Sequence, residues 1–127
     1  MTAGVDTGFF FALEEQHPIA LKVWEEQEIV TSVIVLYEIE KKLLSRRLSR
    51  WPTIMADLRL AVSAIDLGEN DARHVARISH KYGLPGLDSL ILATLLDAKV
   101  KRIYTTDAHF ELYQGKGVEI VNLAKSI

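Results

Sequence analysis

Residues 84–110 constrain the fold more than any other stretch of this chain. The stretch begins with the helix-breaking pair Pro85-Gly86, and the pattern after it predicts a helix over residues 88–100 and a short strand over residues 102–106. Apolar side chains lie on nearly every side of the predicted helix, which is typical of a helix buried in a core. The helix is much shorter than the roughly 20 residues of a membrane span. It therefore indicates a soluble domain built around one buried helix.

One carboxylate lies at the start of this apolar helix. Helical spacing places Asp88 on the same face as Ile91, Leu92 and Leu95. That face is predicted to point into the core. A carboxylate directed at a core destabilises the fold unless it is paired with a cation or binds a metal ion. Asp107, which follows the next strand, raises the same question.

Strands and helices alternate along the rest of the chain. The patterns predict strands over residues 3–5, 28–32, 65–67, 102–106 and 118–123, and helices over residues 9–15, 19–27, 33–47, 53–64, 69–82, 88–100 and 108–113. Gly83 is expected just past the C-terminal end of the helix over residues 69–82. The alternation indicates an α/β fold, a three-layer α/β/α sandwich with a mostly parallel central sheet. At 127 residues the chain is expected to form a single domain, residues 1–127.

Composition limits the chemistry of this chain. It has no cysteine, which excludes a disulfide framework and a thiolate metal site. Its net charge of −2 gives no overall basis for nucleic-acid binding, so any such binding requires a local basic patch. No basic segment precedes an apolar run at the N-terminus, so we expect no signal peptide and a cytoplasmic location.

Acidic side chains also follow the ends of predicted strands. Asp6 and Asp107 lie at strand-to-helix junctions, and Glu38 lies in the second turn of the helix after residues 28–32. The carboxyl ends of parallel strands meet at one edge of a sheet, so these side chains and Asp88 are expected to meet there. Close carboxylates repel one another, and a divalent cation such as Mg²⁺ relieves the repulsion. Two simpler interpretations stay open, in which each Asp is only a helix N-cap and Glu38 only pairs with Lys42.

These motifs resemble those of the PIN domain family, and more closely the VapC-type toxins of toxin–antitoxin pairs. The similarity covers the whole chain and rests on the run VDT near the N-terminus, VIVLYEIEKKL around Glu38, LPGLDSLILATLLDAKV around Asp88, and IYTTDAHF around Asp107. The resemblance implies a Mg²⁺- or Mn²⁺-dependent endoribonuclease that hydrolyses RNA phosphodiester bonds. It implies that Asp6, Glu38, Asp88 and Asp107 bind the metal.

The resemblance also implies a hydroxyl group close before the last acid, and we favour Thr105 over Thr106 for it. The implied partners are an RNA substrate, a VapB-type antitoxin and a second copy of the chain in a homodimer. The chain departs from the family at Gly8, where Ser or Asn is more frequent, and it offers Glu40 as a competitor of Glu38. The departure at Gly8 keeps an alternative function open, a PIN-like binding or assembly module without nuclease activity. A phosphoacceptor domain fits less well, because such domains group acids after the first strand and Asp6 stands alone there.

Two further features lie near these acids in the sequence. His109 is expected on the surface of the short helix over residues 108–113, and contact with the scissile phosphate is the alternative. Lys42, Arg46 and Arg50 follow Glu38 as a basic row, which is either a candidate RNA-binding track or a solvated helix face.

Overall fold

Five parallel strands form the centre of the protein in a computed structural model that describes residues 2–45 and 51–125. Their order across the sheet is β3-β2-β1-β4-β5. The strands are β1 (Thr2–Val5), β2 (Glu28–Ser32), β3 (Val62–Ile65), β4 (Arg102–Thr105) and β5 (Glu119–Asn122). Every pairing between neighbouring strands is parallel, which confirms the predicted α/β class.

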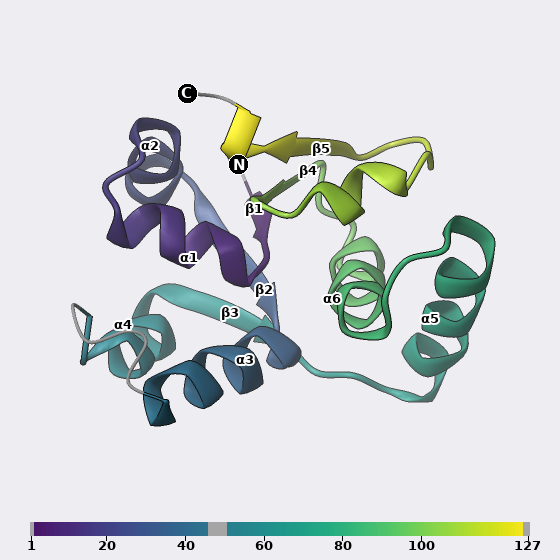
Figure 1. Ribbon diagram of the computed structural model, residues 1–127, viewed down its shortest axis with the longest axis horizontal. Helices are drawn as coiled ribbons and strands as arrows, with labels where there is room; N and C mark the ends of the chain where they lie inside the picture. The colour runs from purple at the N-terminus through teal and green to yellow at the C-terminus, as the bar shows by residue number, and fades with distance from the viewer. Residues whose placement is uncertain (1, 46–50, 126–127) are drawn as a thin grey trace.

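Helices cover both faces of this sheet. They are α1 (Thr7–Glu14), α2 (Pro18–Glu26), α3 (Val33–Leu44), α4 (Ile54–Ala61), α5 (Glu69–Tyr82) and α6 (Gly86–Asp97), with the short 3₁₀ helices η1 (Ala108–Leu112) and η2 (Leu123–Lys125). Figure 1 shows α1 to α4 on one side of the sheet and α5 and α6 on the other. This arrangement follows from right-handed crossovers, because the chain moves from β1 outward to β3 and then returns to add β4 beyond β1. The carboxyl ends of β1 and β4 therefore form the switch point of the sheet, where ligands bind in folds of this class.

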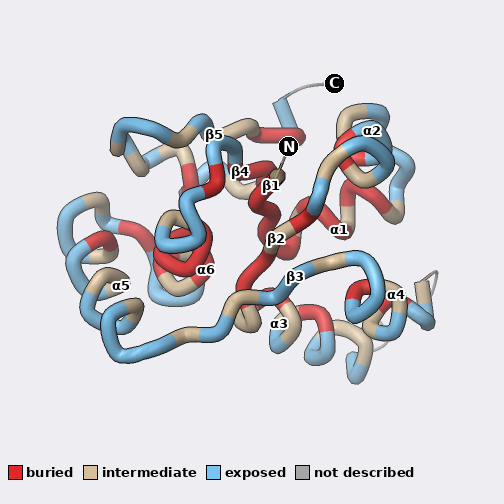
Figure 2. The backbone as a smooth tube through the Cα atoms, turned by 180° about the vertical axis from the view of Figure 1, so that it is seen from behind, coloured by how far each residue is buried: buried red, intermediate tan, exposed pale blue. Residues whose placement is uncertain are grey.

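Helix α6 is the buried helix that the sequence predicts. Ile91, Leu92 and Leu95 are at most 1% exposed, and they belong to one apolar core with buried residues of β1, β2 and β4. Partly buried side chains of β3 and β5 pack against the same core. Figure 2 shows buried backbone running through both β1 and α6. Within the described residues, no helix combines the length and the hydrophobicity that a membrane span requires.

The largest error in a predicted boundary is at β3. The helix predicted over residues 53–64 ends at Ala61, and the strand predicted over residues 65–67 is β3, which begins at Val62. Val62 pairs with Ile29 of β2, and the parallel ladder continues to the pair of Ser32 with Ile65. Because the ladder satisfies backbone groups of β2 along its outer edge, sheet formation overrides the helical pattern.

The predicted C-terminal ends of α3 and α6 also lie beyond the observed ones. The helix predicted over residues 88–100 is α6, which ends at Asp97. The helix predicted to continue to residue 47 ends at Leu44. The hydroxyl of Ser45 donates to the carbonyl oxygen of Lys42 at 3.0 Å, which satisfies one of the free carbonyl groups at the helix end. The predicted end of α5 at Tyr82 is correct, and Gly83 follows it in the left-handed conformation expected there, with φ of 68°.

Candidate functional site

Asp6 lies at the carboxyl end of the central strand β1, almost fully buried. It caps α1, because its Oδ1 accepts the backbone N–H of Phe9 at 3.1 Å, and its Oδ2 accepts the hydroxyl of Thr105. Burial raises the pKa of Asp6 to about 7, against these two hydrogen bonds, and the charges of Asp107 and Asp88 raise it further. Asp6 is therefore both an N-cap and a carboxyl group whose charge the surrounding protein does not compensate.

Thr105 links Asp6 to Asp107. It is the last residue of β4 and is fully buried. Its hydroxyl donates to Asp6 and accepts the backbone N–H of Asp107 at 2.9 Å. Asp107 in turn caps η1 by accepting the N–H of His109 at 2.9 Å. One hydroxyl thus sets the positions of two acids that lie 101 positions apart in the sequence.

Asp88 reaches the same place from the other face of the sheet. It is the third residue of α6, whose N-cap is Pro85, and it makes no capping hydrogen bond, so the N-cap interpretation is wrong for this residue. Its side chain is 18% exposed. Burial raises the pKa of Asp88 to about 6, the negative charges of Asp107 and Glu38 add to the rise, and His109 opposes it.

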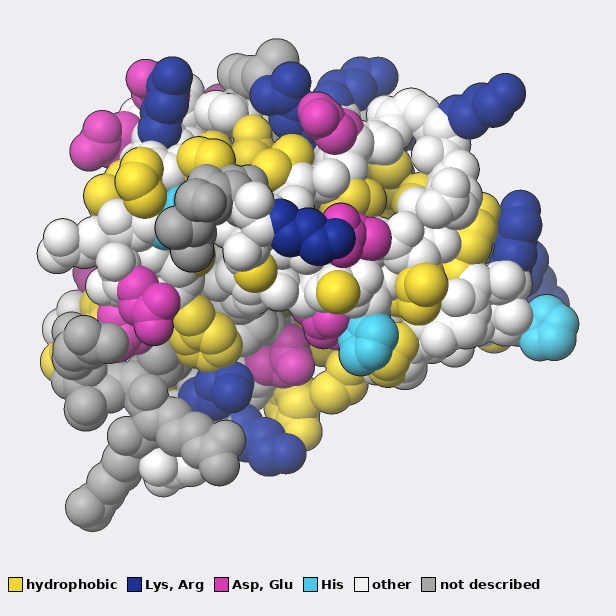
Figure 3. Space-filling view, turned by 45° about the horizontal axis from the view of Figure 1, so that its top comes forward, with side chains coloured by type: hydrophobic (Ala, Val, Ile, Leu, Met, Phe, Trp, Pro, Cys, Tyr) yellow, Lys and Arg dark blue, Asp and Glu magenta, His cyan; other side chains and the backbone are white. Residues whose placement is uncertain are grey.

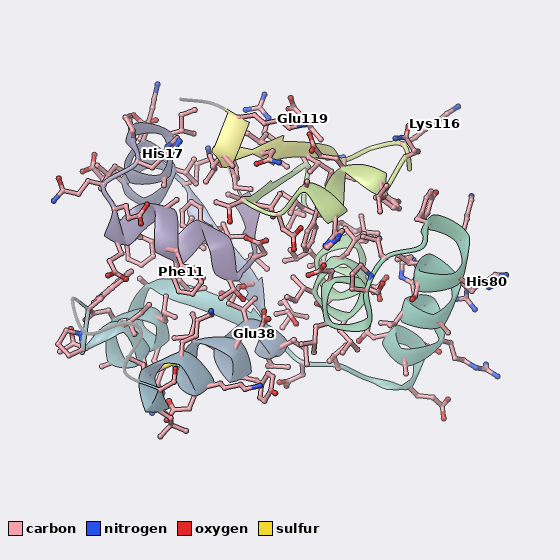
Figure 4. The ribbon with its side chains drawn as sticks, viewed as in Figure 1. Phe11, His17, Glu38, His80, Lys116 and Glu119 are labelled. Atoms are coloured by element: carbon pink, nitrogen blue, oxygen red, sulfur yellow. The ribbon has the colours of Figure 1, made fainter. Side chains whose placement is uncertain are left out.

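Glu38 of α3 lies near these acids, and its charge contributes to the raised pKa of Asp88. Its Oε1 accepts the hydroxyl of Thr7 at 2.5 Å, and Thr7 is the residue after Asp6. In Figure 4 Glu38 lies between α1 and α3, whereas its competitor Glu40 is exposed to solvent. Among the described residues Glu38 has no ion pair with Lys42, whose Nζ instead lies 5.0 Å from the ring centre of Phe11. Thr7 belongs to the VDT run of the sequence, but its contact with Glu38 was not predicted, and its place next to Asp6 is the signal that the sequence offers.

His109 contacts two of these acids. Its Nδ1 lies 3.3 Å from Oδ2 of Asp88 and 3.1 Å from Oδ1 of Asp107. His109 was expected on the surface, and its side chain is 56% exposed, but neither contact was predicted. Figure 3 shows acidic side chains next to a histidine near the middle of one face of the molecule.

The donor set of this site fits a divalent cation. Ligand atoms of Asp88, Asp107 and His109 lie within 4.8 Å of one another. In the part of the chain that the structure describes, no Lys or Arg forms an ion pair with Asp6, Glu38, Asp88 or Asp107. Carboxylate oxygens are the ligands that Mg²⁺ and Mn²⁺ prefer, and a cation would stabilise the ionised carboxylates that burial and, to a lesser degree, mutual repulsion disfavour.

Basic side chains lie beside the site. A cavity of about 410 Å³ next to Glu38 is lined by Lys41, Lys42, Tyr37 and Leu87, among others. Arg46 and Arg50 of the predicted basic row lie outside the described residues.

Gly8 is explained by the packing of α1 against the chain after β4. A Cβ atom at position 8 would overlap the hydroxyl of Thr106 and lie 3.1 Å from both the Cβ and the backbone nitrogen of Thr106. Thr106 therefore fills the space that a side chain at position 8 would occupy. The departure from the family at this position is coupled to a second residue.

We predict that Gly8→Ala lowers the free energy of unfolding by about 1–3 kcal/mol, the usual cost of overpacking. Thr106→Ala, combined with Gly8→Ala, should recover part of this loss, because it removes the overlapping hydroxyl. Urea denaturation of the two single variants and the double variant measures the coupling. Gly86→Ala is the matched control, since no atom lies within 4 Å of the Cβ it would add. Strictly additive effects of the two substitutions would contradict the packing argument.

The fold and the site together define an α/β domain with a cluster of acids at the switch point of a parallel sheet. The model of the PIN domain family matches residues 4–116, and the chain belongs to this family.

Solved structures of toxin–antitoxin proteins share this fold. A toxin–antitoxin complex from Klebsiella pneumoniae matches with a TM-score of 0.74 and 18% identity over 95% of this chain and 97% of that one. VapC20 of Mycobacterium tuberculosis, described as a toxin that cleaves the sarcin-ricin loop, matches with a TM-score of 0.70 and 22% identity over 92% and 98% of the two chains. VapBC2 of Rickettsia felis, bound to a DNA fragment from its promoter, matches with a TM-score of 0.70 and 16% identity over 94% and 97%. No curated protein matches the sequence.

Proposed function

We propose that this protein is a metal-dependent endoribonuclease and the toxin of a VapBC-type toxin–antitoxin pair. The observation that carries the proposal is the group of four carboxylates, Asp6, Glu38, Asp88 and Asp107, which has no Lys or Arg ion-pair partner among the described residues. Membership of the PIN domain family supports a nuclease. The likeness of the fold to VapC20 and to two toxin–antitoxin complexes supports the toxin.

The four acids are the proposed ligands of Mg²⁺ or Mn²⁺. Such an ion, when bound, lowers the pKa of water and balances negative charge on the phosphate oxygens of RNA. The chain itself holds the acids in place before any ion binds. The hydroxyl of Thr105 fixes Asp6 and the backbone of Asp107, and the hydroxyl of Thr7 fixes Glu38. We assign positioning roles to both threonines, because their hydroxyl groups hydrogen-bond to the proposed metal ligands.

An RNA cleavage assay tests this proposal directly. We expect cleavage of single-stranded RNA with Mg²⁺ or Mn²⁺ and none with EDTA. Cleavage that continues in EDTA would contradict a metal-dependent reaction. RNA binding without cleavage in either metal would instead favour the alternative function, a PIN-like binding module without nuclease activity. Gly8 is the departure from the family that motivates this alternative.

The route of the RNA toward the site is part of the proposal. Lys42 lies on the cavity that Glu38 lines, and its position supports a contact with the RNA backbone. Arg46 and Arg50 follow Lys42 in the sequence, and we propose on this basis that they extend its contact with the RNA backbone.

The proposed partners are a VapB-type antitoxin and a second copy of the chain. Leu60 of α4 is 90% exposed and Leu44 of α3 is 77% exposed, and both offer apolar surface for a second copy of the chain. Exposed leucines on neighbouring helices are a typical basis for a two-fold contact between identical chains.

We predict a homodimer of twice 14.3 kDa in light scattering at high micromolar concentration. Leu60→Glu should shift the protein to a monomer, because it places a charge in the apolar contact. Leu112→Glu, at a leucine of η1 that is 45% exposed, is the control and should leave the dimer intact. A wild-type mass of 14.3 kDa at every concentration would exclude the dimer.

A further inference from the structure

We propose that His109 is a nitrogen ligand of the metal site and that the site therefore selects Mn²⁺ and Co²⁺ over Mg²⁺. The inference rests on the proposed function, because it concerns the same site. It adds a ligand of a different chemical class to the four carboxylates, and it predicts which ions the protein prefers.

The distances around the imidazole are those of neighbouring ligands on one ion. In an octahedral site with bonds of about 2.1 Å, adjacent ligand atoms lie about 3.0 Å apart. The Nδ1 of His109 lies 3.1 Å from Oδ1 of Asp107 and 3.3 Å from Oδ2 of Asp88. An ion that binds these two carboxylates therefore needs little movement of the protein to reach the imidazole as well.

The backbone around His109 holds the ring in this position. Asp107 caps η1 and accepts the N–H of His109 at 2.9 Å, so the start of the short helix is fixed. The next residue, Phe110, is 1% exposed and anchors η1 in the core. The ring itself is more than half exposed, which leaves an open approach for an ion from solvent.

A second interpretation of the same distances makes the opposite prediction. A protonated His109 would act as a fixed cation that donates its Nδ1–H to the two carboxylates. A divalent ion would then have to displace it, and removal of the ring would raise the affinity for every ion. If the ring is a ligand, its removal lowers the affinity, and it does so unequally among the ions.

The loss of affinity is expected to differ among the ions because each ion prefers different ligand atoms. Mg²⁺ favours oxygen ligands and keeps several of its waters, so one imidazole adds little to its binding. Transition ions accept imidazole readily, and Co²⁺ gains more than Mn²⁺ in the usual order of stability. Asparagine is the informative replacement for His109, because its short amide carries an oxygen close to the position of Nδ1. The substitution therefore places an oxygen ligand atom where the wild type has the Nδ1 nitrogen.

Isothermal titration of the metal-free protein with MgCl₂, MnCl₂ and CoCl₂ tests the inference without any activity measurement. We expect His109→Asn to weaken Mn²⁺ and Co²⁺ binding about tenfold or more, because an amide oxygen replaces the imidazole nitrogen that transition ions bind readily. Mg²⁺ binding should stay within about twofold, because Mg²⁺ favours oxygen ligands. Asp88→Asn should weaken the binding of all three ions. His74→Asn is the matched control, because His74 also contacts a carboxylate, Asp97, at 3.0 Å but lies between α5 and α6.

Pulsed electron paramagnetic resonance of bound Mn²⁺ gives a direct readout of the ligand. We expect echo modulation from the imidazole nitrogen in the wild type and in His74→Asn, and its loss in His109→Asn. Unchanged or tighter binding of Mn²⁺ by His109→Asn, or the absence of nitrogen modulation in the wild type, would overturn the inference. If His109 is not a ligand but Asp88→Asn still lowers the affinity for the three ions, the proposed metal site stands without the imidazole. Failure of the wild type to bind any of the three ions would overturn the site itself.

Discussion

Asp88→Asn is expected to reduce RNA cleavage on the order of a thousandfold, because it removes a carboxylate from the proposed metal site and with it several kcal/mol of charge stabilisation. Asparagine keeps the shape of the side chain. The substitution leaves α6 intact, since Asp88 makes no capping hydrogen bond that the helix would lose. A loss of activity can therefore be assigned to the charge.

The same variant should change the response of the protein to metal. A ligand at a hundredfold excess over its Kd stabilises the wild type by about 2.7 kcal/mol, which corresponds to a rise in melting temperature on the order of 10 °C. Asp88→Asn should lose most of this rise. Without metal the variant should be more stable than the wild type by about 1 kcal/mol, a figure discounted for the partial exposure of the site. The gain is expected because burial and the charge of Asp107 raise the pKa of Asp88 to about 6 and so disfavour its ionised form.

Asp71→Asn is the matched control for this experiment. Asp71 occupies the third position of α5, as Asp88 does in α6, but it accepts the backbone N–H of Gly68 at 2.8 Å and lies away from the site. Melting curves of the three proteins in EDTA and in millimolar Mn²⁺ are compared with cleavage rates. Equal metal-induced shifts in the wild type and in Asp88→Asn would show that Asp88 is not a ligand, and the nuclease proposal would lose its central residue.

Local patterns were sufficient to predict most elements of this fold. The bounds of β2 and α5 are predicted to the residue, because Glu28–Ser32 lies between breaks in helical pattern and Glu69–Tyr82 has a regular amphipathic repeat ending at Gly83. β3 was misplaced because Val62 fits a helical stripe as well as it fits a strand. Only the pairing of Val62 with Ile29 decides between them, and that pairing is a long-range contact.

Some features of the site could likewise be predicted from local sequence patterns, and others depend on long-range contacts. An acid after a strand or at a helix start is a local signal, and it led to Asp6, Asp88 and Asp107. The contact of His109 with Asp88 depends on how η1 packs beside α6, and the space at Gly8 depends on Thr106, 98 positions later. No periodicity encodes such distances, so these features follow only from the folded chain.

The buried carboxyl group of Asp6 leads to a prediction about pH. Its pKa is about 7 in the folded protein, compared with an ordinary value of 3.8. Between these two values the unfolded chain has released the proton and the folded protein retains it, so the free energy of unfolding falls as pH rises. The loss should total about 4 kcal/mol by pH 8 in the metal-free protein, since each pKa unit corresponds to 1.36 kcal/mol. It is absent below about pH 3, where Asp6 is protonated in both states.

Asp6→Asn isolates this effect, because asparagine resembles the protonated acid and does not titrate. Its Oδ1 can still accept the N–H of Phe9, so the cap of α1 is retained. Groups that shift the other way, such as Glu111, whose pKa is lowered by Lys125 and Asn122, contribute equally to both proteins and cancel in the difference. Urea midpoints in EDTA from pH 4 to pH 8 should therefore show a stability difference that grows from near zero to about 4 kcal/mol in favour of the variant. Millimolar Mn²⁺ at pH 8 should narrow it by stabilising the wild type alone. A difference that stays constant across this range would mean that Asp6 ionises in the folded protein as readily as in the unfolded chain, and the carboxylate cluster would then need no cation to balance it.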